Sequence, residues 1–417
     1  MKKLYIINEN ITNLNKIKYK NFIKYKNLIM YKVIKQIFQI KFEYNIFFTE
    51  NIFDIKNKVL INVFINSCNK KTKAILFVDK KILLLNKKLE QNIINYFKFF
   101  EKDVFLVCHP VVICGGERLK NRFLFLKIFY SLLDKYKICR QSYIISLGGG
   151  SLQDFIGYLS ATTHRGIKLI RIPTTVLSQD DSGVGVKNGI NYNGKKNFIG
   201  SFSVPHTVIN DCNFLSSLDN ENFIEGFSEA IKVALINDAA LFYLIEHNAE
   251  QLLLRNSVYV KDVIYQCAKL HAEHIAKYGD PFESLSSRPL DFGHWAAHKI
   301  ESMSNYNISH GKSVAIGIIM DCTYSYFIGI LQRAIWKKIF FLFIKLKFKI
   351  YVKELSVLKN NFYQIFDGLE EFREHLGGKL TITLITDIGV KIDIHHINIL
   401  VYKKVIKFLK KIHTTIK

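Results

Sequence analysis

Residues 141–154, with the sequence QSYIISLGGGSLQD, contain the pattern that decides the fold. The apolar run within 141–147 predicts a short buried β-strand. Three glycines, Gly148-Gly149-Gly150 (the glycine turn), follow at once, and residues 151–154 begin a helix. Glycine allows close approach of a backbone to a ligand and a helix N-terminus favours anions, so this turn suits a pyrophosphate. A tight turn without a ligand is the alternative, because the standard GxGxxG dinucleotide pattern is absent.

Short apolar runs alternate with helical segments around the glycine turn, which indicates a parallel, doubly wound sheet. We therefore predict an α/β fold with an N-terminal Rossmann-like sheet domain and a C-terminal, mostly helical metal-binding domain. The cleft between the domains is the expected ligand site. Strands are predicted at 74–79, 103–108, 111–114 and 141–147, and helices at 119–136, 221–246, 258–277, 293–304 and 314–326. The predicted parts are a loosely ordered basic extension at 1–36, a nucleotide-binding domain at 37–213 and a helical domain at 214–417.

The composition is that of a globular protein of 417 residues, long enough for two domains. Its seven cysteines are scattered and never spaced CxxC, which favours a reducing compartment over a disulfide framework. The net charge of +24 comes largely from lysines near the two ends, at 16–35 and 336–353. Lysine is enriched together with Asn, Ile and Phe, as AT-rich codon bias produces. We expect no nucleic-acid partner, because no RNA-binding motif or zinc finger accompanies the charge.

No membrane partner is expected either, since the most apolar stretches, 123–133 and 339–344, are short and broken by lysine. The N-terminus lacks an apolar segment with a small-residue cleavage site, which argues against secretion. We expect a soluble protein of the cytoplasm or the plastid stroma, because AT-rich composition fits plastid encoding.

A polar segment follows residues 171–175, which are predicted as a strand that ends in the hydroxyls of Thr174 and Thr175. Residues 179–191 (QDDSGVGVKNGIN) and 194–197 (GKKN) interleave charges and amides with glycines. Polar groups at this density do not predict a core. They suit a site that binds hydroxyls and a phosphate, with a solvated surface loop as the alternative.

Three segments further along supply candidate metal ligands: 225–232, 291–298 and 309–311. Glu229 and Lys232 share one helix face, and so do His294 and His298. One carboxylate and two imidazoles, with one position open, form a common catalytic zinc set whose metal acts as a Lewis acid. A single histidine is more often structural, and we assign that role to those without such a context: His271, His274, His375, His395, His396 and His413.

Ordered motifs run from about residue 42 to about residue 330: 115–117 with Lys120, 148–150 with Asp154, 164–166, 172–175, 181–187, 196–197, 229–232, 292–294 and 310–311. In this order they resemble the 3-dehydroquinate synthase superfamily of sugar phosphate cyclases. The combination of 178–183 with 288–295 most resembles a divergent Ebo-type branch, close to the sedoheptulose 7-phosphate cyclases. The resemblance is specific for the superfamily and much less so for the substrate.

The resemblance implies a role for each matching residue. NAD would be held by Asp79, Glu117, Lys120, Gly148, Gly149, Gly150, Asp154, Thr174 and Thr175. One divalent metal, zinc or else cobalt, would be held by Glu229, His294 and His310. The catalytic set that meets the substrate would be Asp181, Lys187, Lys196, Asn197, Lys232 and Asp291, with Arg165 at the phosphate and His298 near the elimination chemistry.

The implied reaction begins when NAD, with the metal polarising a hydroxyl, transiently oxidises one carbinol of a heptulosonate or heptulose phosphate. The resulting ketone acidifies a neighbouring C–H bond, so that phosphate is eliminated. The ketone is then reduced back, and the chain closes to a carbocycle in an intramolecular aldol step. A small phosphorylated sugar is thus the expected partner, and a homodimer and the shikimate pathway are family expectations.

Several departures from the dehydroquinate synthases lie on the substrate side. Asp291 stands in place of the usual Asn, as in the sedoheptulose 7-phosphate cyclases. The family's phosphate-binding Arg is displaced here, because Ser287 occupies its position and Arg288 follows it. Glu273 stands where the family has a Lys, although Lys269 lies one turn upstream, and Lys312 stands where the family has a Glu. Residues 373–375 and Lys379 stand where a double-Lys motif is expected. The motifs therefore leave the sugar phosphate open.

Three hypotheses follow. The first is a cyclase, with dehydroquinate synthase as the nominal activity and a 2-epi-5-epi-valiolone synthase-like activity close behind. The second is a metal-dependent polyol dehydrogenase such as a glycerol dehydrogenase, which does not need the lysine-rich segment 187–197. The third is a non-enzymatic basic binding protein. The position of the motifs argues against it, because they lie in the middle of the chain, away from the basic ends.

Overall fold

The computed structural model describes residues 33–38, 40–65, 71–277 and 289–416. Residues 43–417 form one compact unit, and residues up to 42 belong to a separate one. The described part of that separate unit carries no helix or strand. Most of the predicted basic extension, and Arg288 with Ser287, lie outside the described residues.

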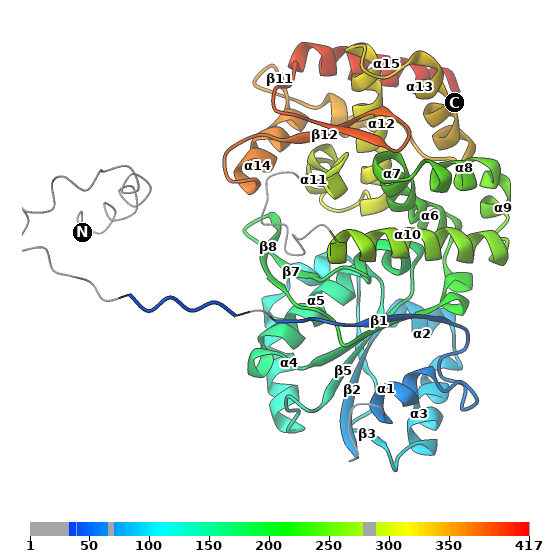
Figure 1. Ribbon diagram of the computed structural model, residues 1–417, viewed down its shortest axis with the longest axis vertical. Helices are drawn as coiled ribbons and strands as arrows, with labels where there is room; N and C mark the ends of the chain where they lie inside the picture. The colour runs from blue at the N-terminus through cyan, green and yellow to red at the C-terminus, as the bar shows by residue number, and fades with distance from the viewer. Residues whose placement is uncertain (1–32, 39, 66–70, 278–288, 417) are drawn as a thin grey trace, which may run out of the picture. The chain divides into compact units, whose positions relative to one another are not determined.

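A seven-stranded sheet lies at the centre of the N-terminal half of the compact unit (Figure 1). Its order is β1-β9-β6-β5-β2-β3, and β4 also pairs with β2. Every pair is parallel, which confirms the predicted α/β fold. The strands are β1 (Asn45–Thr49), β2 (Thr72–Asp79), β3 (Val104–Leu106), β4 (Val111–Ile113), β5 (Tyr143–Gly148), β6 (Lys168–Pro173) and β9 (Thr207–Asp211).

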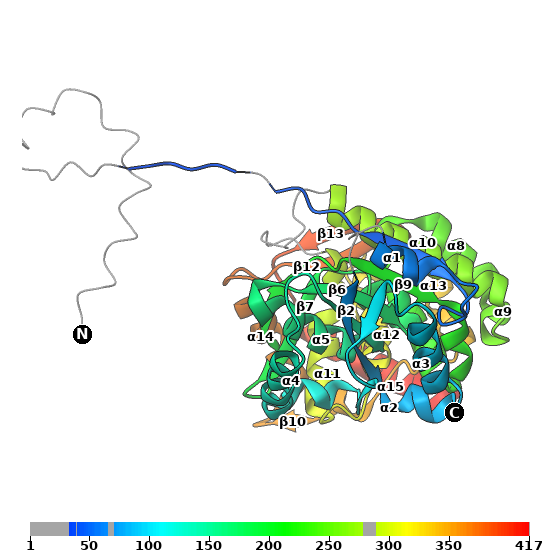
Figure 2. The same cartoon turned by 90° about the horizontal axis from the view of Figure 1, so that it is seen from below.

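Helices cover both faces of this sheet, as Figure 2 shows from below. The central strand β5 is buried at every residue, because a parallel strand between two helical layers needs apolar side chains on both faces. One apolar cluster joins the sheet to α1–α3, and a second joins it to α4 and α5. These helices are α1 (Val59–Ile65), α2 (Lys80–Leu85), α3 (Leu89–Phe99), α4 (Phe123–Lys135) and α5 (Gly150–Thr162). The predicted helix at 119–136 begins instead as a 3₁₀ turn, η3 (Glu117–Asn121).

The polar segment at 179–197 is more ordered than predicted. Ser178–Ser182 form a π-helical turn, η5, and β7 (Lys187–Tyr192) pairs with β8 (Lys195–Phe202) in an antiparallel hairpin. Asn188 and Asn191 are buried in β7, so the expectation that this composition stays out of the core is wrong there. Their amides are accommodated because each is hydrogen-bonded, Asn188 to Arg171 and Asn191 to Glu117.

The chain after β9 is mostly helical, as predicted. The single helix expected at 221–246 is three helices. The break between the second and third falls at Asp238, which is extended and caps α8 by accepting a hydrogen bond from Leu241 N at 2.9 Å. The helices predicted at 258–277, 293–304 and 314–326 are α10 (Ser257–Lys277), α11 (His294–Met303) and α12 (His310–Phe327). The others are α6 (Asn220–Glu225), α7 (Phe227–Asn237), α8 (Ala239–His247), α9 (Ala249–Leu253), α13 (Arg333–Lys345), α14 (Asp367–His375) and α15 (Ile399–Ile416), with hairpins β10 (Leu358–Lys359)–β11 (Phe362–Tyr363) and β12 (Ile382–Asp387)–β13 (Val390–Ile394).

Helices α11 and α12 cross closely because both present glycine at the crossing. Gly293 is the N-cap of α11 with φ 77°, and a Cβ on it would lie 2.8 Å from Ile318 N of α12. Gly317 packs against the Gly293 backbone from the other side. The crossing holds the start of α11, with His294, against α12, which begins at His310.

A buried carboxylate ties these helices to α15. Asp321 on α12 accepts hydrogen bonds from Trp295 Nε1 at 3.1 Å and from Tyr402 OH at 2.7 Å. Burial raises the pKa of Asp321 to about 7, although both hydrogen bonds act to lower it. Asp321 therefore keeps its proton in the folded protein over a pH range in which the unfolded chain has lost it.

Replacing Asp321 with Asn is expected to flatten the pH dependence of stability. Because the folded pKa is raised, the contribution of Asp321 to the free energy of unfolding should fall as pH rises from about 4 to about 7, by at most about 1.4 kcal/mol per pH unit. Urea unfolding followed by fluorescence measures this, since both tryptophans, Trp295 and Trp336, lie in the helical half. The exposed Asp134→Asn change is the control and should leave the wild-type slope. Parallel curves for wild type and Asp321→Asn would contradict the assignment.

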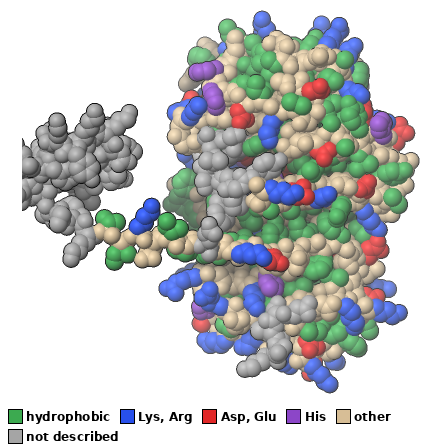
Figure 3. All heavy atoms as spheres, in the orientation of Figure 1, with side chains coloured by type: hydrophobic (Ala, Val, Ile, Leu, Met, Phe, Trp, Pro, Cys, Tyr) green, Lys and Arg blue, Asp and Glu red, His purple; other side chains and the backbone are tan. Residues whose placement is uncertain are grey.

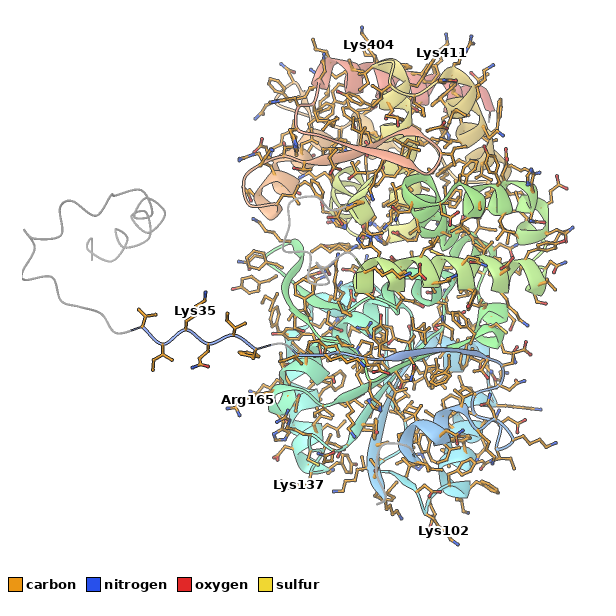
Figure 4. The ribbon with its side chains drawn as sticks, viewed as in Figure 1. Lys35, Lys102, Lys137, Arg165, Lys404 and Lys411 are labelled. Carbon is orange, nitrogen blue, oxygen red and sulfur yellow. The ribbon has the colours of Figure 1, made fainter. Side chains whose placement is uncertain are left out.

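The basic C-terminal helix α15 has its apolar side in the core and its lysines outside. Val405, Ile406 and Leu409 are buried, while Lys404 and Lys411 project outward from the helical half (Figure 4). Lysine and arginine side chains are likewise scattered over the face in Figure 3. Within the described ranges no helix has the length and apolar character needed to cross a bilayer.

Candidate active site

Glu229, His294 and His310 come together between helices α7, α11 and α12. His294 Nε2 lies 3.4 Å and His310 Nε2 3.5 Å from Glu229 Oε1. One donor atom from each residue lies within 4.8 Å of the others, which is compact enough for a single ion. Glu229 is wholly buried. The three residues that the resemblance implies as metal ligands therefore meet in the structure.

Both imidazoles of this trio are oriented by a second contact. His294 Nδ1 lies 3.1 Å from the Phe292 carbonyl oxygen, and His310 Nδ1 lies 2.8 Å from Glu301 Oε1. Since each Nδ1 faces an acceptor, it is the nitrogen that keeps its proton when a metal takes the Nε2 lone pair. Histidines that bind metals in proteins usually have such an outer partner.

The charge of the site favours a cation. Lys232 pairs with Glu229 Oε2, and burial, which raises the pKa of Glu229, is outweighed by Lys232 and His294, so that the carboxyl is ionised. Asp181 is also ionised nearby, so two carboxylates surround one ammonium. Glu229 Oε1 makes no hydrogen bond of normal geometry within the described residues. A buried carboxylate oxygen left in this way fits a divalent ion between Glu229, His294 and His310.

Asp181 is held from the opposite side by a residue that the sequence analysis assigned to structure. His271 Nδ1 of α10 lies 2.9 Å from Asp181 Oδ1. Burial and Glu229 act to raise the pKa of Asp181, but His271 and Lys232 outweigh them and lower it. His271 therefore positions a predicted substrate-binding carboxylate.

The tip of the β7–β8 hairpin brings Lys196 and Asn197 to the site. Lys196 Nζ lies 2.6 Å from Glu301 Oε2 and 3.3 Å from His310 Nδ1. The Asn197 backbone N–H donates to Asn191 Oδ1 at 2.9 Å, which fixes the tip. Lys187 begins β7 at the far end of the hairpin with an exposed side chain. Asp291 ends the 3₁₀ turn η7 (Pro289–Asp291) and acts electrostatically on Lys232.

His298 lies one turn along α11 from His294. Its ring centroid is 5.4 Å from that of His294 and 5.9 Å from that of His310. Burial, with Lys196 and His294, holds the pKa of His298 well below its ordinary value, so the ring is neutral. A neutral imidazole beside the trio can accept a proton.

The glycine turn leads into a helix whose first amides are free of a side-chain cap. Gly149 is the N-cap of α5 and makes no capping bond. Gly150 leaves no room for a side chain, since a Cβ would lie 2.6 Å from Ser182 Oγ. An uncapped N-terminus under such close packing suits an anionic group such as a pyrophosphate.

Three of the residues implied for NAD form an internal charge network beside this turn. Lys120 Nζ lies 2.8 Å from Asp154 Oδ2 and 3.4 Å from Glu117 Oε1, and it also contacts Asn197. Burial opposes the charge of Lys120, but the two carboxylates outweigh it and raise the pKa of Lys120. The network thus joins the glycine turn to the hairpin tip.

The other implied NAD residues are partly engaged with their own backbone. Asp79 ends β2 and caps α2 by accepting from Lys81 N at 2.9 Å. Thr175 Oγ1 lies 2.8 Å from Ser178 Oγ, and Thr174 is buried with its N–H donated to the Gly148 carbonyl oxygen. These side chains shape the turn, and their roles toward NAD stay predictions.

Arg165 is not brought to this cluster. It follows the C-terminal end of α5 in the 3₁₀ turn η4 (Thr163–Arg165) and projects outward from the α/β half (Figure 4). The 13-residue helix α5 separates it from the glycine turn by about 20 Å. The geometry of one chain therefore does not support the implied contact between Arg165 and a substrate phosphate at the trio.

Sequence reasoning missed Glu301, His271 and Asn191. Glu301 left a usable signal, because residues 294, 298 and 301 share one face of a helix. His271 left none, because its partner Asp181 lies on another element, and Asn191 lies in the polar segment 179–191 but was not singled out there.

Comparisons with known proteins agree with this geometry. The family descriptions "3-dehydroquinate synthase N-terminal" and "3-dehydroquinate synthase C-terminal" match residues 110–225 and 226–368. A 3-dehydroquinate synthase of Campylobacter fetus subsp. fetus is 37% identical over 236 residues, 55% of this chain and 64% of that protein. One of Shewanella halifaxensis is 33% identical over 286 residues, 68% of this chain and 78% of that protein.

A solved structure shares the fold over nearly the whole chain. ValA, the 2-epi-5-epi-valiolone synthase of Streptomyces hygroscopicus subsp. jinggangensis 5008, superposes with a TM-score of 0.78 at 21% identity. The match covers 92% of this chain and 99% of ValA, which was solved with NAD+ and Zn2+ bound. With both family descriptions in chain order, and the Glu229–His294–His310 trio within the second, the chain belongs to the 3-dehydroquinate synthase family of sugar phosphate cyclases.

Proposed function

We propose that this chain is a 3-dehydroquinate synthase-like cyclase, a carbon–oxygen lyase that acts on a heptulosonate or heptulose phosphate. The observation that carries the proposal is the contact of the buried Glu229–His294–His310 trio with two ammonium groups, those of Lys196 and Lys232. A metal in such a trio activates a hydroxyl or carbonyl, and ammonium groups beside it stabilise the anionic parts of a sugar phosphate.

The residues fit one divalent metal and one NAD. The trio would hold Zn2+, or else Co2+, and the glycine turn with the N-terminus of α5 would hold the NAD pyrophosphate. When bound, the two groups supply a Lewis acid and a reversible two-electron acceptor. The NAD+ and Zn2+ in ValA support this pair of ligands.

The chain's own residues then orient the substrate and move protons. Asp181, held by His271, accepts hydrogen bonds from substrate hydroxyls, and Lys232 and Lys196 face the charged groups. His298, neutral and beside the trio, takes up the proton that is released as phosphate is eliminated. Asn197 and Asp291 complete the set. Lys187, at the far end of the hairpin, remains a proposed contact on the resemblance alone.

A heptulose phosphate without a carboxylate, as in the valiolone synthase-type reaction, is favoured by Asp291. Its negative charge acts on the buried Lys232, which already pairs with Glu229. A heptulosonate carboxylate near Lys232 would also meet the negative charges of Glu229 and Asp291, which disfavour it. We also propose, on the resemblance, a homodimer in the cytoplasm or plastid stroma, with a place in the shikimate pathway if dehydroquinate is the product.

The proposal predicts phosphate release without net NADH. Purified protein with NAD and Zn2+ would be offered 3-deoxy-arabino-heptulosonate 7-phosphate, sedoheptulose 7-phosphate and glycerol. One of the two sugar phosphates is expected to release phosphate while absorbance at the NADH wavelength stays flat, because the ketone is reduced back in the same cycle. Steady NADH formation on glycerol, with no phosphate from either sugar, would instead support a polyol dehydrogenase.

A further inference from the structure

Glu301 is a buried carboxylate at the boundary between the two halves of the site. Its side chain is only 3% exposed and lies on α11, on the face that carries His294 and His298. One oxygen, Oε1, lies 2.8 Å from His310 Nδ1, and the other, Oε2, lies 2.6 Å from Lys196 Nζ. Each oxygen therefore serves a different functional group.

The contact with His310 fixes which ring nitrogen can bind a metal. Because Glu301 Oε1 accepts from Nδ1, the proton stays on that nitrogen when Nε2, which faces Glu229, gives its lone pair to a metal. A carboxylate on the outer nitrogen also increases the basicity of the inner one. His310 is 26% exposed, so without Glu301 its ring has space to turn.

The contact with Lys196 joins the α/β half to the helical half. Lys196 is on β8 and Glu301 on α11, 105 residues further along the chain. The ammonium lies close to the trio because Glu301 holds it there. Among the other described contacts of this lysine is His310 Nδ1 at 3.3 Å, a donor that repels rather than holds it.

A second metal ion beside the trio is a competing reading. His298, Glu301 and His310 also bring one donor atom each within 4.8 Å. The Lys196 ammonium, however, is already close to both Glu301 and His310 and supplies the positive charge there. The arrangement is therefore one metal trio and one ammonium group, and the Glu301 carboxylate contacts both, through His310 and through Lys196.

We propose that Glu301 is a positioning residue that sets the His310 tautomer for metal binding through one oxygen and holds Lys196 at the substrate through the other. The proposal rests on the proposed function for the role of Lys196, whereas its metal part is independent of the substrate. Removing the carboxylate loses both effects. Changing it to an amide keeps an acceptor for His310 but presents an NH₂ group to Lys196, so the two effects separate.

The test uses the full-length protein with Glu301→Ala and Glu301→Gln. The matched control is Glu371→Gln, which removes an exposed carboxylate of α14 that lies 2.6 Å from Lys299 of α11, the helix that carries Glu301. Cobalt titration gives the metal affinity, and the Co2+ absorption bands report the ligand geometry. Glu301→Ala should weaken cobalt binding by about 10–100-fold and alter the bands. Glu301→Gln should keep the affinity within a few-fold of wild type, and Glu371→Gln should change nothing.

Steady-state kinetics on the preferred sugar phosphate supply the second readout. Glu301→Gln with saturating metal should lower kcat by at least about tenfold, the size of effect that loss of one charged positioning contact produces. Unchanged cobalt affinity and bands in a folded Glu301→Ala protein would overturn the metal part. Wild-type kcat in Glu301→Gln would overturn the lysine part. If no sugar phosphate is turned over at all, the proposed function fails while the cobalt result still decides the role of Glu301 toward His310.

Discussion

Replacing Glu229 with Gln or His294 with Ala is expected to abolish metal binding and, with it, activity. Both side chains reach the same point with His310, and the buried Glu229 supplies the only carboxylate of that trio. Purified wild-type protein should contain about one ion per chain and the variants almost none. Lewis-acid stabilisation of several kcal/mol corresponds to a loss of at least about 1000-fold in kcat. Elemental analysis and phosphate release measure the two effects.

His298→Ala is the matched control for metal content, because His298 lies on the same helix face one turn away but outside the trio. It should keep its metal while losing activity. The opposite pattern, with metal lost from His298→Ala and kept in Glu229→Gln, would move the ion to the His298–Glu301–His310 group. His294→Ala keeps the test usable if Glu229→Gln, which leaves Lys232 buried without its partner, fails to fold.

Replacing Arg171 with Met should cause the largest loss of stability. Arg171 on β6 is wholly buried, and its guanidinium donates to Gly183 O at 3.0 Å, Gly185 O at 2.5 Å and Asn188 Oδ1 at 2.6 Å. Methionine fills a similar volume but leaves these three acceptors without a donor. At about 1–3 kcal/mol for each unsatisfied buried group, the expected loss is at least about 3 kcal/mol.

Urea unfolding followed by far-ultraviolet circular dichroism measures the effect, and amide hydrogen exchange should show residues 183–202 opening first. Arg333→Met on the exposed start of α13 is the control and should change stability by less than about 0.5 kcal/mol. Arg171→Lys should lie between the two, since one ammonium cannot reach all three acceptors. A Met variant as stable as wild type would show that the guanidinium does not hold this segment.

The sheet and the metal trio were accessible from sequence for different reasons. Strand β5 is covered on both faces, so nearly all of its side chains must be apolar, and residues 143–147 can be recognised as a strand from the sequence. His294 and His298 were paired by helical spacing, and the resemblance singled out Glu229 and His310. No strand was predicted for the hairpin β7–β8, because buried Asn188 and Asn191 break the apolar pattern that normally marks a strand.

The sequence by itself determined the α/β class, the helical character of the C-terminal half and the candidate metal ligands, because these depend on local periodicity, turn chemistry and motif order. Only the tertiary structure decided how the site is supported. It joined Lys196 to Glu301, set His271 against Asp181, placed Arg171 inside the core and pointed Arg165 away from the trio. Such contacts link residues far apart in the chain. Whether a polar side chain is buried and paired or exposed depends on which distant element packs against it, and that packing leaves no periodic signal in either segment.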